Sequence, residues 1–240
     1  MTTQQVRLER REKIADGTMA FQFEKPAGFS FKPGQAIDVV LVDPPAGDAQ
    51  SSRHAFSIVS APFQGELVVA TRMRDSAYKR ALKALPIGSR AKLEGPFGSL
   101  TLHNERTRPA VFIAGGIGIT PFVSILRQAA EDRLPQQLLL LYSNRRPEDA
   151  AFLEELQQLE QQNKRFRLVA TMTEMGKSGR PWNGETGLIG EALVRRTVAG
   201  LPAPVYYVVG PPAMVEAMRE TLNKAGVDAD DVRSEEFYGY

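Results

Sequence analysis

After Pro109 the sequence alternates between short apolar runs and longer amphipathic segments, and this alternation constrains the fold more than any other feature. The apolar runs are AVFIA, LLLLY, FRLVAT and VYYVV, and they alternate with predicted helices at 120–130, 148–162, 191–197 and 213–225. Uninterrupted apolar runs are typical of parallel strands buried on both faces, and the helices between them act as crossover connections. We therefore predict a doubly wound parallel sheet, which binds ligands at the carboxyl ends of its strands.

The part of the chain before residue 105 lacks this alternation. It shows short strand-like runs separated by proline and glycine, at 18–23, 36–42, 55–59, 67–72 and 90–93. This spacing predicts an antiparallel barrel or sandwich. One exception is Ser76–Leu85, where a capping serine precedes a short apolar-periodic run and predicts a single helix. The polar segment Leu102–Arg108 is the predicted boundary, which gives domains at 1–105 and 106–240.

The composition narrows the possible chemistry. The 240 residues are 42% hydrophobic and 24% charged with a net charge of +2, which is typical of an ordinary globular chain. There is no cysteine, which excludes disulfides and any iron–sulfur cluster bound by this chain. The two histidines, His54 and His103, lack the spacing of a metal site, so no bound metal is expected. Redox chemistry would therefore need an organic cofactor.

The distribution of charged and apolar residues argues against nucleic-acid and membrane partners. Acidic and basic residues are mixed along the chain and form no basic stripe. The longest uncharged stretch, Ala110–Leu126, is broken by glycines and a proline, unlike a membrane span. The N-terminus is charged where a signal peptide has its apolar segment. We expect a cytoplasmic protein that acts as a monomer.

Two glycine loops follow predicted strands of the second half. In the first, Gly115, Gly116 and Gly118 lie between a strand and a helix that begins at Thr120. Glycines let the backbone approach an anion, and a helix N-terminus offers free N–H groups, so this loop is predicted to bind phosphate. The alternative is a tight connection that binds nothing. The second loop, Gly210–Pro211–Pro212, shapes the carboxyl end of another predicted strand.

Several segments together resemble a known family. They are AFSIVSAP at 55–62, RMRDSAYKRAL at 72–82, GPFG at 95–98, GGIGITP at 115–121, GPPAM at 210–214, and the ending SEEFYGY. In order and spacing they resemble the ferredoxin-NADP reductase superfamily, over nearly the whole chain. The resemblance implies an antiparallel Greek-key β-barrel that binds flavin, followed by a pyridine-nucleotide domain. It implies FAD, or less often FMN, as cofactor, with NADPH or NADH as co-substrate.

The resemblance also assigns flavin contacts within and beside the segment Ala55–Pro62. Phe56 matches the aromatic ring that lies against the isoalloxazine, and Ser57 matches the catalytic serine whose hydroxyl reaches flavin N5. The family's arginine, two residues before the aromatic, is replaced by His54, with Arg53 beside it. Either side chain is a candidate for the flavin phosphates. Ser76 matches the helix start that faces the pyrophosphate.

The end of the chain resembles the family's acidic-aromatic terminus. Glu236 and Phe237 fall on its two positions, and the ring of Phe237 is expected to cover the flavin and to give way to nicotinamide during catalysis. Tyr238 and Tyr240 extend beyond it and are alternatives for this stacking role. The residue before the Gly-Pro-Pro loop is Val209, where the family often has cysteine.

The segment after LLLLY bears on which nucleotide is used. Ser143, Arg145 and Arg146 are the candidate contacts there, and no acid occupies the end of the strand. An acid at that position would accept a hydrogen bond from a ribose 2′-hydroxyl, whereas two arginines could bind a 2′-phosphate. These residues favour NADPH over NADH.

The resulting hypothesis is hydride transfer from NAD(P)H to FAD, followed by delivery of electrons to a separate acceptor. Candidate acceptors are ferredoxin, flavodoxin, an oxygenase component or a small molecule. The alternative is a flavin-binding redox sensor or electron-transfer subunit without independent turnover. Anaerobic addition of NADPH or NADH to the purified protein discriminates between the two, because only the enzyme bleaches its flavin.

Overall fold

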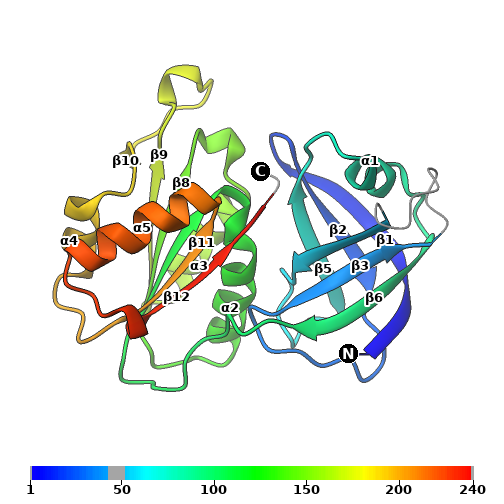
Figure 1. Cartoon of the computed structure of the whole chain (residues 1–240), viewed down its shortest axis with the longest axis horizontal. Helices are drawn as coiled ribbons and strands as arrows, with labels where there is room; N and C mark the ends of the chain where they lie inside the picture. Colours follow the sequence, from blue (N-terminus) through cyan, green and yellow to red (C-terminus); the bar gives the residue numbers. More distant parts are fainter. Residues whose placement is uncertain (1, 43–51, 239–240) are drawn as a thin grey trace. The chain divides into compact units, whose positions relative to one another are not determined.

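The computed structural model describes residues 2–42 and 52–238, and the chain forms two units (Figure 1). The first unit runs to Thr101 and includes Thr120–Gln128. The second consists of Leu102–Ile119 and the chain from Ala129 onward. Within the described residues, no helix has both the length and the apolar character needed to cross a membrane.

A six-stranded antiparallel sheet with strand order β4-β3-β6-β1-β2-β5 forms the first unit. An isolated antiparallel bridge pairs Ile58, the residue directly after β4, with Val69 of β5, so the two edges of the sheet meet and close it into a barrel. The predicted antiparallel barrel is thereby confirmed. The strands are β1 (Thr2–Ala15), β2 (Thr18–Glu24), β3 (Ala36–Leu41), β4 (Arg53–Ser57), β5 (Glu66–Arg72) and β6 (Arg90–Phe97).

Strand β1 was not predicted, because its sequence is rich in charged residues. It pairs first with β6, over Thr2–Arg7, and then with β2, from Leu8 onward. Val6 and Leu8 are buried, whereas the charged residues of the second half are exposed. The long strand therefore contributes to the core through few side chains, and its charges hide the alternation that would identify it.

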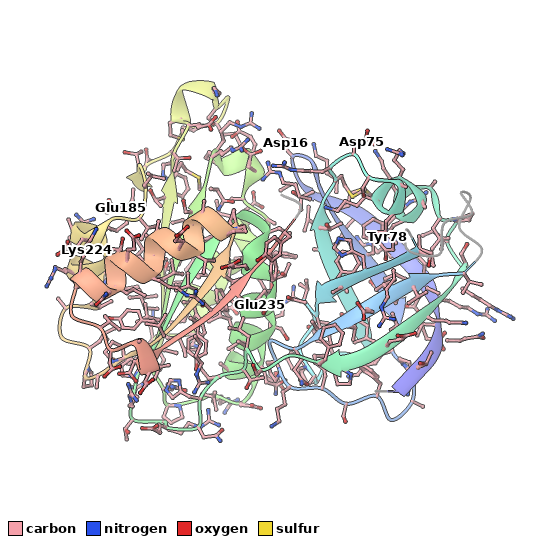
Figure 2. The ribbon with its side chains drawn as sticks, viewed as in Figure 1. Asp16, Asp75, Tyr78, Glu185, Lys224 and Glu235 are labelled. Atoms are coloured by element: carbon pink, nitrogen blue, oxygen red, sulfur yellow. The ribbon has the colours of Figure 1, made fainter. Side chains whose placement is uncertain are left out.

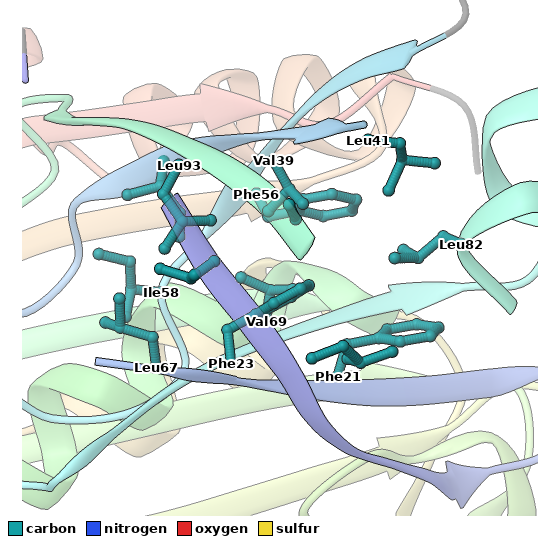
Figure 3. Packing of buried hydrophobic residues seen from close by; sticks show 14 of the residues in the cluster. Phe21, Phe23, Val39, Leu41, Phe56, Ile58, Leu67, Val69, Leu82 and Leu93 are labelled. Carbon is teal, nitrogen blue, oxygen red and sulfur yellow. The ribbon is translucent and has the colours of Figure 1, made fainter. Parts of the chain in front are cut away.

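The barrel core is made of buried aliphatic and aromatic side chains, including Phe21, Phe23 and Val39 (Figure 3). Helix α1 (Ala77–Ala84) covers one part of this core through Tyr78 and Leu82. Ser76 caps the helix as predicted, because its side chain accepts a hydrogen bond from the backbone N–H of Lys79 at 3.2 Å. Fully burying such side chains stabilises the unit by roughly 1.5 to 3 kcal/mol each.

The tyrosine of this helix also has a polar contact. The hydroxyl of Tyr78, a residue labelled in Figure 2, donates to the Val39 carbonyl at 2.9 Å. This hydrogen bond ties α1 to β3. Burial raises the pKa of Tyr78, so the hydroxyl stays protonated and remains a donor. The helix start is therefore fixed relative to the barrel wall.

A parallel six-stranded sheet with order β10-β9-β8-β7-β11-β12 forms the second unit, and the predicted doubly wound sheet is confirmed. The short strand β12 was not predicted. The strands are β7 (Ala110–Gly115), β8 (Leu138–Asn144), β9 (Phe166–Met172), β10 (Glu185–Thr186), β11 (Val205–Gly210) and β12 (Val232–Glu236). The helices of the second unit are α3 (Leu153–Gln162), α4 (Glu191–Val198) and α5 (Pro212–Lys224). Helix α2 (Thr120–Glu131) follows β7 in the chain, but its residues 120–128 belong to the first unit.

The predicted helix at 148–162 is wrong in its first turn. Pro147–Asp149 forms a separate 3-10 turn, and Phe152 then adopts a left-handed conformation with φ of 61°. A phenylalanine in that region of backbone space ends any continuous helix, so α3 begins only at Leu153. The break leaves the 3-10 turn as part of the loop at the carboxyl end of β8.

The segment Leu102–Arg108 is bound to the second unit. The Tyr207 hydroxyl lies 2.8 Å from both the backbone nitrogen and Nδ1 of His103. Gln136 Nε2 donates to the carbonyl of Arg108 at 2.7 Å. Burial lowers the pKa of His103, so a neutral imidazole sits in this network.

Candidate functional site

The two glycine loops meet at the carboxyl ends of β7 and β11. These strands are neighbours in the sheet. The chain passes from β7 to β8 on one side and later crosses to β11 on the other side of β7, so the carboxyl ends of β7 and β11 form a topological switch point. A Cβ on Gly118 would lie 2.5 Å from the carbonyl oxygen of Val209. A Cβ on Gly115 would lie 3.2 Å from Cδ of Pro211. The glycines therefore allow the two loops to approach each other.

The first glycine loop differs from its predicted form. Gly115 is the last residue of β7, and Gly116–Ile119 forms a 3-10 turn that runs directly into α2 at Thr120. Gly116 has φ of 51°, a conformation that suits glycine. Thr120 is 1% exposed. The loop is therefore a compact helical turn between strand and helix.

Phe237 lies at the same edge of this sheet. Strand β12 is parallel to β11, with Glu236 paired to Gly210, and the Phe237 backbone N–H donates to the Gly210 carbonyl at 2.9 Å. Phe237 is half-buried, whereas Tyr238 is 74% exposed and its hydroxyl donates to Glu236 at 2.5 Å. Tyr240 lies outside the described residues. The structure thus brings Phe237 together with the Gly-Pro-Pro loop.

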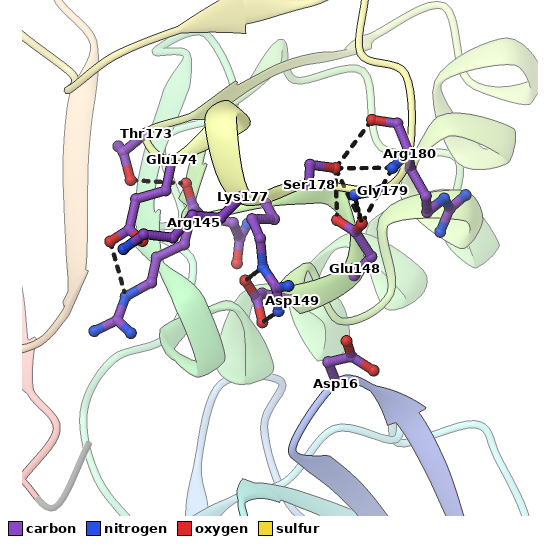
Figure 4. A network of polar contacts seen from close by, with 12 residues as sticks. Asp16, Arg145, Glu148, Asp149, Thr173, Glu174, Lys177, Ser178, Gly179 and Arg180 are labelled. Atoms are coloured by element: carbon purple, nitrogen blue, oxygen red, sulfur yellow. Dashed lines mark hydrogen bonds and ion pairs between the residues drawn. The ribbon is translucent and has the colours of Figure 1, made fainter.

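The two arginines after β8 have different surroundings (Figure 4). Arg146 makes a two-pronged ion pair with Asp149, at 2.8 and 2.9 Å, and the Asp149 side chain is 5% exposed. Arg145 is 60% exposed and lies 3.7 Å from the Glu174 carboxylate. Ser143 is half-buried at the end of the strand. Arg145 is therefore the better placed of the two to contact a ligand.

Glu148 ties the loop after β8 to the loop after β9. Its carboxylate accepts hydrogen bonds from the Ser178 hydroxyl at 2.9 Å and from the backbone N–H groups of Gly179 and Arg180, at 2.8 and 3.2 Å. Hydrogen bonding lowers the pKa of Glu148, mainly through its backbone and also through Ser178. The two loops at the carboxyl ends of β8 and β9 thus form one connected structure (Figure 4).

Glu174 is a residue that the sequence reasoning missed. It lies two residues beyond β9, and its backbone N–H donates to the Arg145 carbonyl at 2.7 Å. The Lys177 ammonium, at 2.8 Å, and the nearby Arg145 lower the pKa of Glu174, which keeps the carboxylate charged. The only sign of this residue in the sequence is an acid just past a predicted strand. That sign points to Arg145 only once the strand order is known, because the strand order shows that the ends of β8 and β9 are neighbours.

Strand β4 presents its two faces to different surroundings. Arg53 forms ion pairs with Asp38 and Glu94, at 2.5 and 2.8 Å, on the outward face. His54 and Phe56 share the inward face and stack at 4.6 Å between ring centroids, with an angle of 16° between the planes. Phe56 is 6% exposed and belongs to the barrel core.

Residues of β4 and α1 come together at one end of the barrel. The His54 ring lies 5.3 Å from the Tyr78 ring. Burial lowers the pKa of His54, and the charge of Lys79 lowers it further. Ser57 is 6% exposed, and Ala55 is exposed on the outward face with Arg53. The sequence-predicted residues of this strand therefore divide by alternation: His54 and Phe56 share the inward face, and Arg53, Ala55 and Ser57 share the other.

A family model for the oxidoreductase NAD-binding domain matches residues 112–220. Ferredoxin–NADP reductase B of Sorangium cellulosum is 30% identical over 225 residues, which cover 90% of this chain and 89% of that protein. The chain belongs to the ferredoxin-NADP reductase family. The resemblance seen in the sequence motifs is thereby confirmed.

Other relatives of this family member are longer. The reductase component of propane 2-monooxygenase from Rhodococcus jostii is 30% identical over 217 residues, which cover 89% of this chain and 57% of that protein. The chain spans 60% of the length of the glycine betaine monooxygenase reductase subunit from Chromohalobacter salexigens. It thus matches only part of these oxygenase reductases.

Solved structures confirm the fold of this ferredoxin-NADP reductase family member. A ferredoxin NADP+ reductase from Neisseria gonorrhoeae, solved with bound FAD and NADP, has a TM-score of 0.81 at 21% identity over 98% of both chains. The Amycolatopsis cytochrome P450 reductase GcoB has a TM-score of 0.82 at 22% identity, over 98% of this chain and 70% of that chain. At these identities the likeness establishes the fold.

The family implies FAD, and residues of the first unit of this ferredoxin-NADP reductase family member fit such a group. Helix α1 has no acidic residue in its first turn, and Lys79 in that turn is 6% exposed. Burial and the charge of Arg74 lower the pKa of Lys79. A helix start that carries a buried amine and no carboxylate suits a diphosphate. His54 and Ser57 belong to β4, and Phe56 of the same strand packs in the barrel core.

Proposed function

We propose that this chain is an FAD-dependent NAD(P)H oxidoreductase that passes electrons to a separate acceptor. The observation that carries the proposal is the edge of the parallel sheet at which Gly115 and Gly118 meet the Gly-Pro-Pro loop and Gly210 holds the backbone of Phe237. An anionic nucleotide suits this edge, because it combines close backbone approach with helix N-termini. Bound FAD would supply the hydride acceptor, and the chain would supply binding and alignment.

For the flavin, we propose contacts from His54, Phe56 and Ser57 of β4 and from Ser76 at the start of α1. His54 is preferred to Arg53 for the phosphate end, because Arg53 is held by two carboxylates on the opposite face of the strand. The Phe56 ring would hold the His54 ring in position through their stacked contact. In this proposal Ser57 offers a hydroxyl that can donate and accept near the reacting nitrogen of the flavin.

For the nucleotide, we propose a diphosphate contact at Gly115, Gly116 and Gly118, where α2 begins at Thr120. The Gly210–Pro211 corner would shape the nicotinamide end. Phe237, whose backbone N–H donates to the Gly210 carbonyl, would occupy the flavin surface when nicotinamide is absent. These assignments need no general base, since hydride transfer moves no proton through a side chain.

Ser143 and Arg145 are the proposed contacts to the ribose end of the nucleotide. Arg145 is preferred to Arg146 because Asp149 already holds both prongs of the Arg146 guanidinium. NADPH and NADH are both candidate co-substrates on this basis.

The proposed acceptor is a separate protein carrier, an oxygenase component or a small molecule. Relatives include oxygenase reductase components and a ferredoxin–NADP reductase, which supports this class of acceptor. A cytoplasmic location and a monomeric state belong to the same proposal, and size-exclusion chromatography with light scattering tests the latter.

The experiment for this function is purification with added FAD, identification of the bound flavin, and anaerobic addition of NADH or NADPH. The proposal predicts a one-to-one FAD complex that loses its visible flavin band when the nucleotide is added. A flavin that binds and stays oxidised would contradict turnover and favour an electron-transfer module, and a chain that binds no flavin would contradict both.

A further inference from the structure

Two oppositely charged side chains lie side by side at the carboxyl ends of β8 and β9 (Figure 4). Arg145 Nε is 3.7 Å from Glu174 Oε1, which is a long separation for an ion pair, and the Glu174 side chain is 35% exposed. The other carboxylate oxygen, Oε2, accepts from the Lys177 ammonium at 2.8 Å. Glu174 is therefore held mainly by Lys177, and it stands as a negative charge beside Arg145.

The sheet fixes this arrangement. The backbone N–H of Thr173 donates to the Asn144 carbonyl at 2.9 Å, and that of Glu174 donates to the Arg145 carbonyl at 2.7 Å. The two hydrogen bonds continue the pairing of β8 with β9 beyond the last strand residues. The acid and the arginine are thus neighbours because of backbone register, and a long flexible side chain is not needed to bring them together.

In sheets of this kind, the diphosphate of a dinucleotide lies at the first strand and the ribose 2′-group lies at the end of the second strand. Here the glycine loop follows β7, and β8 is the neighbouring strand. The sequence of β8 has no acid at its end, but the loop after β9 brings Glu174 beside Arg145, the first residue after β8. The ribose end of the proposed nucleotide would therefore meet both Arg145 and Glu174.

The two forms of the nucleotide differ at this point in charge and in hydrogen-bond chemistry. A 2′-hydroxyl can donate a hydrogen bond to a carboxylate, whereas a phosphate ester carries about −1.5 to −2 charges and only accepts. Arg146 cannot offset the added charge, because Asp149 holds it in an ion pair. Two cations, Arg145 and Lys177, meet one carboxylate here, and Glu174 cancels part of the attraction that these cations would offer a dianion.

We propose that Glu174 is a specificity-determining residue that accepts a hydrogen bond from the ribose 2′-hydroxyl and repels a 2′-phosphate, so that this chain uses NADH in preference to NADPH. The inference rests on the proposed function and names the nucleotide for that same site. It reverses the preference that Arg145 and Arg146 suggest when the sequence is read alone.

The test is calorimetric titration of the FAD-loaded protein with NAD+ and with NADP+, for the wild type and for Glu174→Gln. The wild type is expected to bind NAD+ more tightly. Glu174→Gln is expected to shift the ratio of the two dissociation constants toward NADP+ by about tenfold, which corresponds to about 1.4 kcal/mol. The shift should shrink as salt rises from low to high concentration, because it arises from charge repulsion at an exposed site.

The matched control is Glu154→Gln, which removes another exposed carboxylate beside an arginine of the same region, Arg180, and should leave the ratio unchanged. A ratio that is unaltered by Glu174→Gln, or a wild type that prefers NADP+, would overturn the inference while the proposed function stands. Failure of the wild type to bind either nucleotide would contradict the proposed function itself. A shift that does not depend on salt would indicate an altered loop and would also overturn the inference.

Discussion

The carbonyl oxygen of Val209 lies so close to Gly118 that a Cβ on this glycine would be only 2.5 Å from it. The contact partner is backbone, so it cannot turn aside as a flexible side chain could. The loops after β7 and β11 therefore approach each other closely because residue 118 has no side chain. This places the proposed diphosphate contact next to the Gly-Pro-Pro corner.

We predict that Gly118→Ala lowers the free energy of unfolding by about 1 to 3 kcal/mol, as overpacking does elsewhere. It should also weaken NADH binding, because one loop must shift. Denaturant titration and calorimetry measure the two effects. Gly176→Ala is the control, since a Cβ there has nothing within 4 Å and the residue has no positive φ, so stability should stay within about 0.5 kcal/mol of the wild type.

Replacement of the two arginines after β8 should give different results. Arg145→Gln is expected to raise the Michaelis constant for NADPH several-fold more than that for NADH, because it removes the exposed positive charge near the 2′-group. Arg146→Gln removes the ion pair with the buried Asp149 carboxylate, so it should lower stability by roughly 3 kcal/mol and affect both nucleotides alike. Steady-state kinetics and thermal unfolding distinguish the two, and equal nucleotide effects from both variants would count against the assignment.

The choice between His54 and Arg53 is tested by flavin affinity. His54→Ala is expected to weaken FAD binding by about tenfold, or 1.4 kcal/mol, because His54 shares a face with Phe56 and the start of α1. Arg53→Ala removes ion pairs on the outer face and should change FAD binding little. Titration of the flavin-free protein with FAD, followed by fluorescence, gives both constants. A larger loss for Arg53→Ala, or no loss for either variant, would refute this assignment.

A pH dependence follows from His103. Burial lowers its pKa in the folded chain below the ordinary value of about 6.5, so the unfolded chain binds more protons between the two values. The free energy of unfolding should therefore fall as pH drops from about 6.5 toward the folded pKa. Urea titrations of the wild type and His103→Gln over this range should show a shallower loss in the variant. His54, whose pKa is also lowered, is present in both proteins and cancels in the difference. Parallel curves would contradict the prediction.

The sequence predicted the architecture well where residue pattern and burial agree. The runs AVFIA, LLLLY and VYYVV form parallel strands that are buried on both faces, whereas FRLVAT forms a parallel strand in which Arg167 is exposed. Strand β1 was missed because its exposed charges mask the few inward residues, such as Val6 and Leu8. The helix break at Phe152 depends on a backbone conformation that residue type alone does not indicate.

Residue types indicated which groups could form the site, but their partners depend on the fold. Arg53 and His54 were equivalent candidates until strand register assigned them to opposite faces. Arg145 and Arg146 could not be separated until Asp149 was seen to hold one of them. Glu174 is distant from both arginines along the chain, and only the pairing of β8 with β9 makes it their neighbour.

The most direct test of the account is transient kinetics of flavin reduction with NADH that carries deuterium at the transferred position of nicotinamide C4. We expect the oxidised flavin band to disappear without oxygen, and deuterium to slow this step, because a hydride passes from C4 to the flavin. A band that persists, or a reduction rate that is the same with hydrogen and deuterium, would contradict it.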